Sequence, residues 1–180
     1  MSLQGPKLTV VFAHGKESGP WGTKITWLAD TSRELGCPVE SVNFSTTFSP
    51  DVRVAMLNEV LDDLKGPFVL VGSSMGAYVV TVASATYRPM AMLLMAPVVY
   101  LPGYAVQELT PCADHTAVVH GWHDQVVPVE NVLRFCREHS LELHLLPDGH
   151  QLLECRSQLQ SLFQRILQDC LWRLKSPLPG

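Results

Sequence analysis

The segment Gly72–Gly76, with the sequence Gly-Ser-Ser-Met-Gly, most constrains the fold of this 180-residue chain. It follows an unbroken apolar run, Phe68–Val71, and leads into a segment rich in small residues. The G-x-S-x-G spacing predicts a strand, a sharp turn and a helix, with Ser74 at the apex of the turn. In so tight a turn, a side chain at either glycine would collide with neighbouring backbone. An ordinary strand-to-helix turn can show the same spacing, so the rest of the chain has to decide the role of Ser74.

Apolar runs alternate with helical patterns along the whole chain. Strands are predicted at Leu8–Ala13, Val39–Phe44, Phe68–Val71, Met90–Met95, Thr116–His120 and Leu141–Leu146. Helices are predicted at Thr23–Leu35, Asp51–Leu64, from the turn at Gly76 to Tyr87, at Pro128–His139 and at Leu152–Leu174. This alternation predicts a three-layer α/β/α fold with about six mostly parallel strands. We expect one domain at residues 8–174, an N-terminal extension at 1–7 and a tail at 175–180.

Composition and charge narrow the function classes. Apolar residues make up 47% of the chain, the formal net charge is −4, and no Lys/Arg cluster forms a basic stripe, which argues against nucleic acid as a partner. No apolar run has the length of a membrane span, and the N-terminus lacks the pattern of a signal peptide. The five cysteines are odd in number and none has C-x-x-C spacing. Free thiols in the cytoplasm are therefore expected. The oligomeric state is left open.

Three polar residues follow predicted strands in an informative order. Ser74, Asp124 and His150 each lie three or four residues after the end of one, and in a parallel sheet such ends meet at one edge. A serine hydroxyl needs a neighbouring base to act as a nucleophile, and histidine suits this role because its pKa lies near neutrality. An aspartate would orient that histidine. We predict a catalytic triad, with the oxyanion held by the N–H groups of Met75 and Lys16.

Four motifs, in this order, resemble those of small, lidless α/β-hydrolases of the serine-esterase type. They are Phe12–Gly15, Gly72–Gly76, the G-W-H-D-Q-V-V-P segment Gly121–Pro128, and the D-G-H segment Asp148–His150. The loop Glu17–Lys24 also resembles the bacterial YqiA-like esterases. The resemblance implies a carboxylesterase-like hydrolase of small-molecule acyl esters or thioesters, which needs no metal or organic cofactor.

The chain departs from the family pattern in two respects. It lacks the two N-terminal antiparallel strands, and the cap domain is reduced to Ala96–Asp114, which implies an open, shallow site. Two alternatives stay open: a peptidase, amidase or perhydrolase on the same triad, and a non-enzymatic binding module that keeps the fold.

Other residues near the predicted strand ends offer alternatives to this interpretation. His14 and Asp148 are more typical of structural roles in their loops, and the H-x-x-H pair His120 and His123 lacks the carboxylate of a zinc-protease motif. Ser73, one residue before the apex, should point elsewhere. Six residues on loops near the predicted site are candidates for substrate binding: Trp21, Tyr100, Tyr104, Trp122, Val127 and Leu152.

Overall fold

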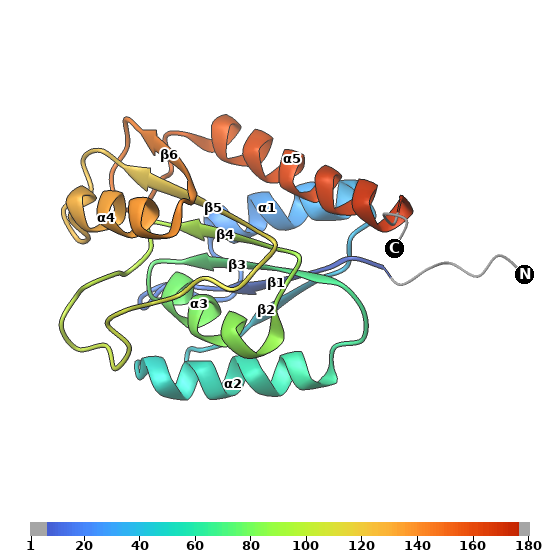
Figure 1. The fold of residues 1–180 in the computed structure, drawn as a ribbon, viewed down its shortest axis with the longest axis horizontal. Helices are drawn as coiled ribbons and strands as arrows, with labels where there is room; N and C mark the ends of the chain where they lie inside the picture. Colours follow the sequence, from blue (N-terminus) through green and yellow to red (C-terminus); the bar gives the residue numbers. More distant parts are fainter. Residues whose placement is uncertain (1–6, 177–180) are drawn as a thin grey trace, which may run out of the picture.

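The computed structural model describes residues 7–176, and its centre is a six-stranded, entirely parallel sheet (Figure 1). The strand order is β2-β1-β3-β4-β5-β6. The strands are β1 (Thr9–Ala13), β2 (Val39–Val42), β3 (Phe68–Ser73), β4 (Ala91–Met95), β5 (His115–Gly121) and β6 (Glu142–Leu146). The helices are α1 (Thr23–Glu34), α2 (Pro50–Asp63), α3 (Met75–Tyr87), α4 (Val129–His139) and α5 (Arg156–Lys175).

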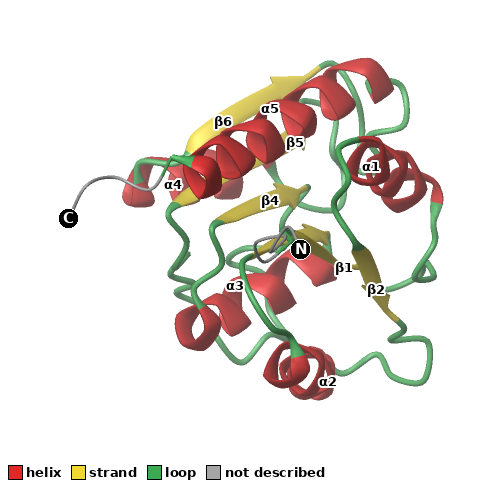
Figure 2. Ribbon diagram, turned by 90° about the vertical axis from the view of Figure 1, so that its right-hand side faces the viewer, coloured by secondary structure: helices red, strands yellow, loops and turns green. Residues whose placement is uncertain are grey.

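The helices cover both faces of the sheet, so the predicted three-layer α/β/α fold is confirmed. Helices α1 and α5 lie together on one face, and α2, α3 and α4 cover the other (Figures 1 and 2). The middle strands are buried on both faces: all five residues of β4 have exposed fractions of 0%. Such strands must be apolar throughout, which is why they are recognisable as continuous runs in the sequence.

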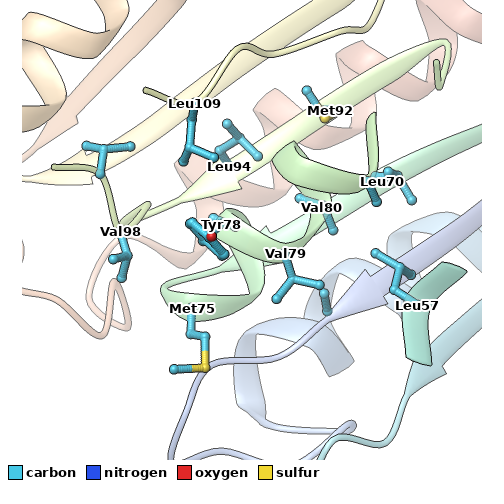
Figure 3. Close-up of a cluster of buried hydrophobic side chains, with 14 of the residues drawn as sticks. Leu57, Leu70, Met75, Tyr78, Val79, Val80, Met92, Leu94, Val98 and Leu109 are labelled. Atoms are coloured by element: carbon cyan, nitrogen blue, oxygen red, sulfur yellow. The ribbon is translucent and has the colours of Figure 1, made fainter. Parts of the chain in front are cut away.

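Each face of the sheet has its own hydrophobic core. On the α2–α3–α4 side, Tyr78, Val80 and Leu94 pack at its centre (Figure 3). On the other side, Phe12 of β1 packs against Phe163 of α5, with ring centroids 6.4 Å apart. Each large apolar side chain buried in this way contributes about 1.5–3 kcal/mol to folding. Packing on both faces holds the strands in place, and with them the edge of the sheet at which their carboxyl ends lie.

The strand order reverses between β1 and β3. Strand β2 lies on one side of β1, whereas β3 and all later strands lie on the other. At such a reversal the loops after two neighbouring strands leave in opposite directions and leave room for a ligand. The loop that begins at His14 and the turn at Ser74 flank this position.

The last helix begins later than the sequence pattern predicts. Helix α5 starts at Arg156 instead of Leu152, because residues 150–151 and 154–155 form turns. The buried carboxylate of Asp148 accepts hydrogen bonds from the N–H groups of Glu154 and Cys155, at 2.9 and 3.2 Å. These bonds stabilise a turn in place of the first helical residues.

The segment between β4 and β5 contains turns and bends but no helix, so no cap domain covers the site. Among residues 7–176, none of the helices combines the length and the apolar character that crossing a bilayer would require. The predicted N-terminal extension at 1–7 and tail at 175–180 lie almost wholly outside the described residues.

Candidate active site

Ser74 stands at a strained turn between β3 and α3. Its φ and ψ angles are 55° and −117°, a region that residues other than glycine rarely adopt. The turn is held because the Ser74 N–H donates to the Met95 carbonyl at 2.8 Å, while the Ser74 carbonyl accepts from Ala77 N–H at 3.0 Å. The strain is therefore maintained by the sheet and by the first turn of α3.

Both glycines of the motif are required by close backbone contacts. A Cβ atom at Gly76 would lie 2.0 Å from the carbonyl oxygen of Ala13, and one at Gly72 would lie 2.5 Å from Ala77 Cα. No side chain fits at either position. The close approach brings the first turn of α3 against the end of β1, next to the loop that begins at His14.

A chain of two hydrogen bonds connects Ser74, His150 and Asp124. His150 Nδ1 lies 2.7 Å from Asp124 Oδ2, and His150 Nε2 lies 2.9 Å from Ser74 Oγ. The carboxylate can only accept, so Nδ1 carries the proton and the lone pair of Nε2 faces the serine hydroxyl. The three residues come from the ends of β3, β5 and β6, as their sequence positions predict.

Asp124 is fixed in its position by further contacts. Its side chain is completely buried, and its Oδ1 atom accepts hydrogen bonds from the N–H groups of Val126 and Val127 at 2.8 and 2.9 Å. The imidazole of His120 is also fully buried and lies 3.6 Å from Oδ2. Burial lowers the pKa of His120, so this ring is neutral beside the carboxylate. Asp124 therefore uses Oδ2 for His150, while two backbone N–H groups hold its Oδ1 atom in place.

The loop after β1 is anchored by a buried arginine that the sequence analysis did not identify. Arg53 of α2 is completely buried, and its guanidinium donates to the carbonyls of His14, Gly15 and Lys16 at 3.3, 3.1 and 3.3 Å. Its Nε donates to Thr47 O at 3.0 Å. A sequence signal did exist: Arg53 lies four residues before the buried Leu57, on the stripe of α2 that faces the core.

His14 supports the same loop. Its Nε2 accepts a hydrogen bond from Phe44 N–H at 3.0 Å, so its Nδ1 carries the proton and donates to Gly15 O at 2.8 Å. Burial lowers the pKa of this imidazole. The ring is thus neutral and engaged on both sides, in agreement with the structural role expected from the sequence.

The anchored carbonyls determine where the neighbouring N–H groups point. No peptide bond is cis in the described chain, and in a trans peptide the carbonyl and the next N–H point to opposite sides. Since Gly15 O points to Arg53 and His14, the N–H of Lys16 points away from them. No described residue accepts a hydrogen bond from the N–H of Lys16 or of Met75. Both groups are available to a ligand.

A cavity of about 630 Å³ opens at Ser74 and His150. This volume lies within the range of small-molecule sites, roughly 300–1,000 Å³. Part of the lining comes from Gly15–Gly19 and Gly22–Ile25, and another part includes Val98, Leu101 and Tyr104. The absence of a cap therefore does not leave the site flat, because two loops supply the walls.

Of the six predicted substrate-binding residues, the structure brings only Tyr104 into this cavity lining. Val127 and Leu152 lie in the two cores with exposed fractions of 0%, and their neighbours Val126 and Leu153 line the cavity instead. In each pair, adjacent side chains point to different sides of the chain. The sequence of a loop does not reveal which of the two faces the cavity.

The other three predicted residues lie outside the cavity lining. Trp21 and Trp122 are half exposed, and Trp21 packs against Arg33. Tyr100 donates to Glu138 and stacks on Arg134, 4.1 Å from ring centroid to guanidinium carbon, so it fastens its loop to α4.

The competing candidates have other surroundings. Asp148 accepts from Gly149 N–H at 2.7 Å and serves the turn there. Ser73 is buried and precedes the apex. His123 is exposed, whereas its partner in the H-x-x-H pair, His120, is enclosed. Within the described residues, neither Asp148 nor Ser73 forms a hydrogen bond with the imidazole of His150.

No protein-family model matches the chain, and no curated protein matches its sequence. Solved structures are similar to it. A protein from Xanthomonas campestris, described as a hydrolase of the alpha/beta superfamily, shares 28% identity and a TM-score of 0.82 over 91% of this chain and 99% of its own. A second Xanthomonas campestris protein, described as an a/b serine hydrolase without a lid, shares 22% identity and a TM-score of 0.74, over 90% and 81% of the two chains.

The esterase Pf2001 from Pyrococcus furiosus is similar at 17% identity and a TM-score of 0.79, over 92% of this chain and 84% of that one. At such low identity the likeness concerns the fold. The similar structures share the arrangement of sheet and helices that brings the ends of β3, β5 and β6 together here.

Proposed function

We propose that this chain, which is a small α/β-hydrolase without a lid, hydrolyses a carboxylic ester or thioester through an acyl-enzyme intermediate. The observation that carries the proposal is the pair of hydrogen bonds from His150 to Ser74 and Asp124, at 2.9 and 2.7 Å. A serine becomes a nucleophile only beside a base, and this base has its tautomer fixed.

In the first step, Ser74 Oγ attacks the acyl carbon while His150 Nε2 takes the hydroxyl proton. The new imidazolium is stabilised by the buried Asp124 carboxylate. The tetrahedral oxyanion then accepts hydrogen bonds from the N–H groups of Met75 and Lys16. Met75 is the first residue of α3, so the positive end of that helix adds to the stabilisation.

Collapse of this intermediate breaks the bond to the leaving group, which takes the proton back from His150. Water then repeats the sequence on the acyl group: His150 removes its proton, and Ser74 leaves as the protonated hydroxyl. The chemistry uses only side-chain and backbone groups of the chain. Five free cysteines, four of them buried, support a cytoplasmic location for the enzyme.

Labelling with a fluorophosphonate probe tests the proposal, because the probe reacts with an activated serine. We expect wild-type protein to be labelled and to hydrolyse short p-nitrophenyl esters, and Ser74→Ala to lose both properties. Ser73→Ala is the matched control, since Ser73 lies one residue away and forms no hydrogen bond with His150 among the described residues. A folded wild-type protein that is neither labelled nor active would rule the mechanism out.

A further inference from the structure

A lysine lies in the wall of the cavity that contains Ser74. Lys24, in the first turn of α1, lines this cavity together with Ser74 and His150. It is half-buried, and no described residue forms a hydrogen bond or an ion pair with its ammonium group. The ammonium is also not one of the fully enclosed side-chain atoms that lack a partner, so part of its surface is accessible.

The nearby carboxylates are already occupied. Asp124 accepts from His150, Val126 and Val127, and Asp148 accepts from three backbone N–H groups of its own loop. Both are close enough to raise the pKa of Lys24, yet burial outweighs them and lowers that pKa to about 8. The lysine is thus held at an electrostatic cost inside the cavity, and the described residues provide no direct counter-ion.

The other charged residues that line the cavity, Glu17 and Lys16, do not neutralise the charge of Lys24. Glu17 lies on the exposed part of the loop after β1 and makes no ion pair with Lys24. Lys16 is exposed, and its ammonium lies over the ring of Phe48, 5.8 Å from the centroid. Within residues 7–176, Lys24 thus feels the field of Asp124 and Asp148 but forms no ion pair, and it lines the same cavity as the nucleophile.

The first turn of α1 reinforces this positive character. Its N-cap is Gly22, which makes no side-chain cap, and the turn contains no acidic residue. Gly22, Thr23 and Ile25 line the cavity beside Lys24. The positive end of the helix dipole thus adds to the field of the ammonium at this wall.

We infer that Lys24 binds a carboxylate carried by the substrate, so that the hydrolysed ester or thioester is an anion. This inference rests on the proposed function and names its substrate class. The carboxylate belongs to the acyl part or to the alcohol part, and both would present the same group to Lys24. A charge-assisted hydrogen bond in a partly desolvated wall favours such a substrate over a neutral one of the same shape by roughly 10- to 100-fold.

Matched pairs of esters test the inference. On the acyl side, mono-p-nitrophenyl glutarate is compared with p-nitrophenyl valerate, which has the same chain length without the charge. On the alcohol side, 4-acetoxybenzoate is compared with p-tolyl acetate. We expect a higher kcat/KM for the charged member of one pair, and Lys24→Met should reduce that charged-over-neutral ratio by roughly 10- to 100-fold. The pair that responds identifies which part of the substrate carries the carboxylate.

Two variants control for other effects of the substitution. Lys24→Arg keeps the charge and should retain most of the preference, and Lys65→Met removes an exposed lysine outside the cavity and should leave the ratio unchanged. Hydrolysis of neutral esters without a Lys24-dependent preference in either pair would overturn the inference and leave the hydrolase intact.

Binding separates failure of the inference from failure of the proposed function. Monomethyl glutarate, whose acyl part carries a carboxylate, is titrated calorimetrically into Ser74→Ala, with and without Lys24→Met. If wild-type protein cleaves none of the esters, the hydrolase proposal fails. Lys24-dependent binding would then still support the anion site, and the absence of binding would overturn it.

Discussion

A hydrogen bond of 3.1 Å joins the guanidinium of Arg53 to the carbonyl of Gly15, across 38 residues of sequence. Through this contact, helix α2 fixes the loop after β1. The same peptide unit contains the N–H of Lys16, which points the opposite way. Arg53, which does not line the cavity, thus orients the N–H of Lys16, a residue that does.

Replacing Arg53 with methionine should therefore affect both stability and turnover. The carbonyls of His14, Gly15 and Lys16 would each lose the hydrogen bond from Arg53, so we expect the free energy of unfolding to fall by about 2–4 kcal/mol. In the protein that stays folded, kcat should fall by roughly tenfold or more with a smaller change in KM, since the oxyanion donor is misplaced. Urea unfolding and ester kinetics measure the two effects. Arg33→Met, at an exposed ion pair with Asp30, is the control. An unchanged kcat in folded Arg53→Met would contradict the role.

Asp124→Asn should abolish most of the activity without disturbing the fold. The amide can present an N–H to His150, which would favour the tautomer whose Nε2 carries the proton and cannot accept from Ser74. We expect kcat to fall on the order of 10³- to 10⁴-fold. Asp114→Asn, at the surface ion pair with Arg173, should leave kcat unchanged. Comparable activity of the two variants would exclude Asp124 as the orienting acid.

Gly76→Ala should destabilise the protein strongly. The added Cβ would lie 2.0 Å from the Ala13 carbonyl oxygen, a distance that only a backbone shift can relieve. Rearrangement at this point costs roughly 1–3 kcal/mol or more. Thermal unfolding measures the loss, and Gly19→Ala, where a Cβ meets nothing within 4 Å, is the matched control. Equal melting temperatures for the two variants would show that β1 and α3 are not tightly apposed.

Lys24→Met should increase stability near neutral pH. The pKa of Lys24 is lowered from 10.5 to about 8, because burial penalises its charged form. Between these values the unfolded chain binds more protons than the folded one, so wild-type stability rises with pH across this window. The advantage of Lys24→Met is therefore complete below about pH 8 and shrinks as the pH rises toward 10.5. Denaturant unfolding at pH 7 and pH 10 measures it. A constant difference between the two proteins would mean that burial does not perturb this lysine.

The sequence by itself determined the parallel sheet and the residues at the strand ends. Central strands such as β4 must be apolar on both faces, and tight turns such as the one at Ser74 require glycines at fixed offsets. These demands are local, so they leave a readable pattern. Ser74, Asp124 and His150 could be predicted as site candidates for the same reason, because each lies within four residues of the end of a recognisable strand.

Only the tertiary structure decided which side chains line the cavity. Val126 and Leu153 line it while Val127 and Leu152 are buried, a difference that depends on how two loops turn against the sheet. Arg53 and Lys24 are ordinary helix residues in the sequence. Packing between distant segments removes one guanidinium from water and leaves the lysine in the wall of the cavity that contains Ser74. Burial of that kind is a property of the whole fold, and a local sequence pattern does not record it.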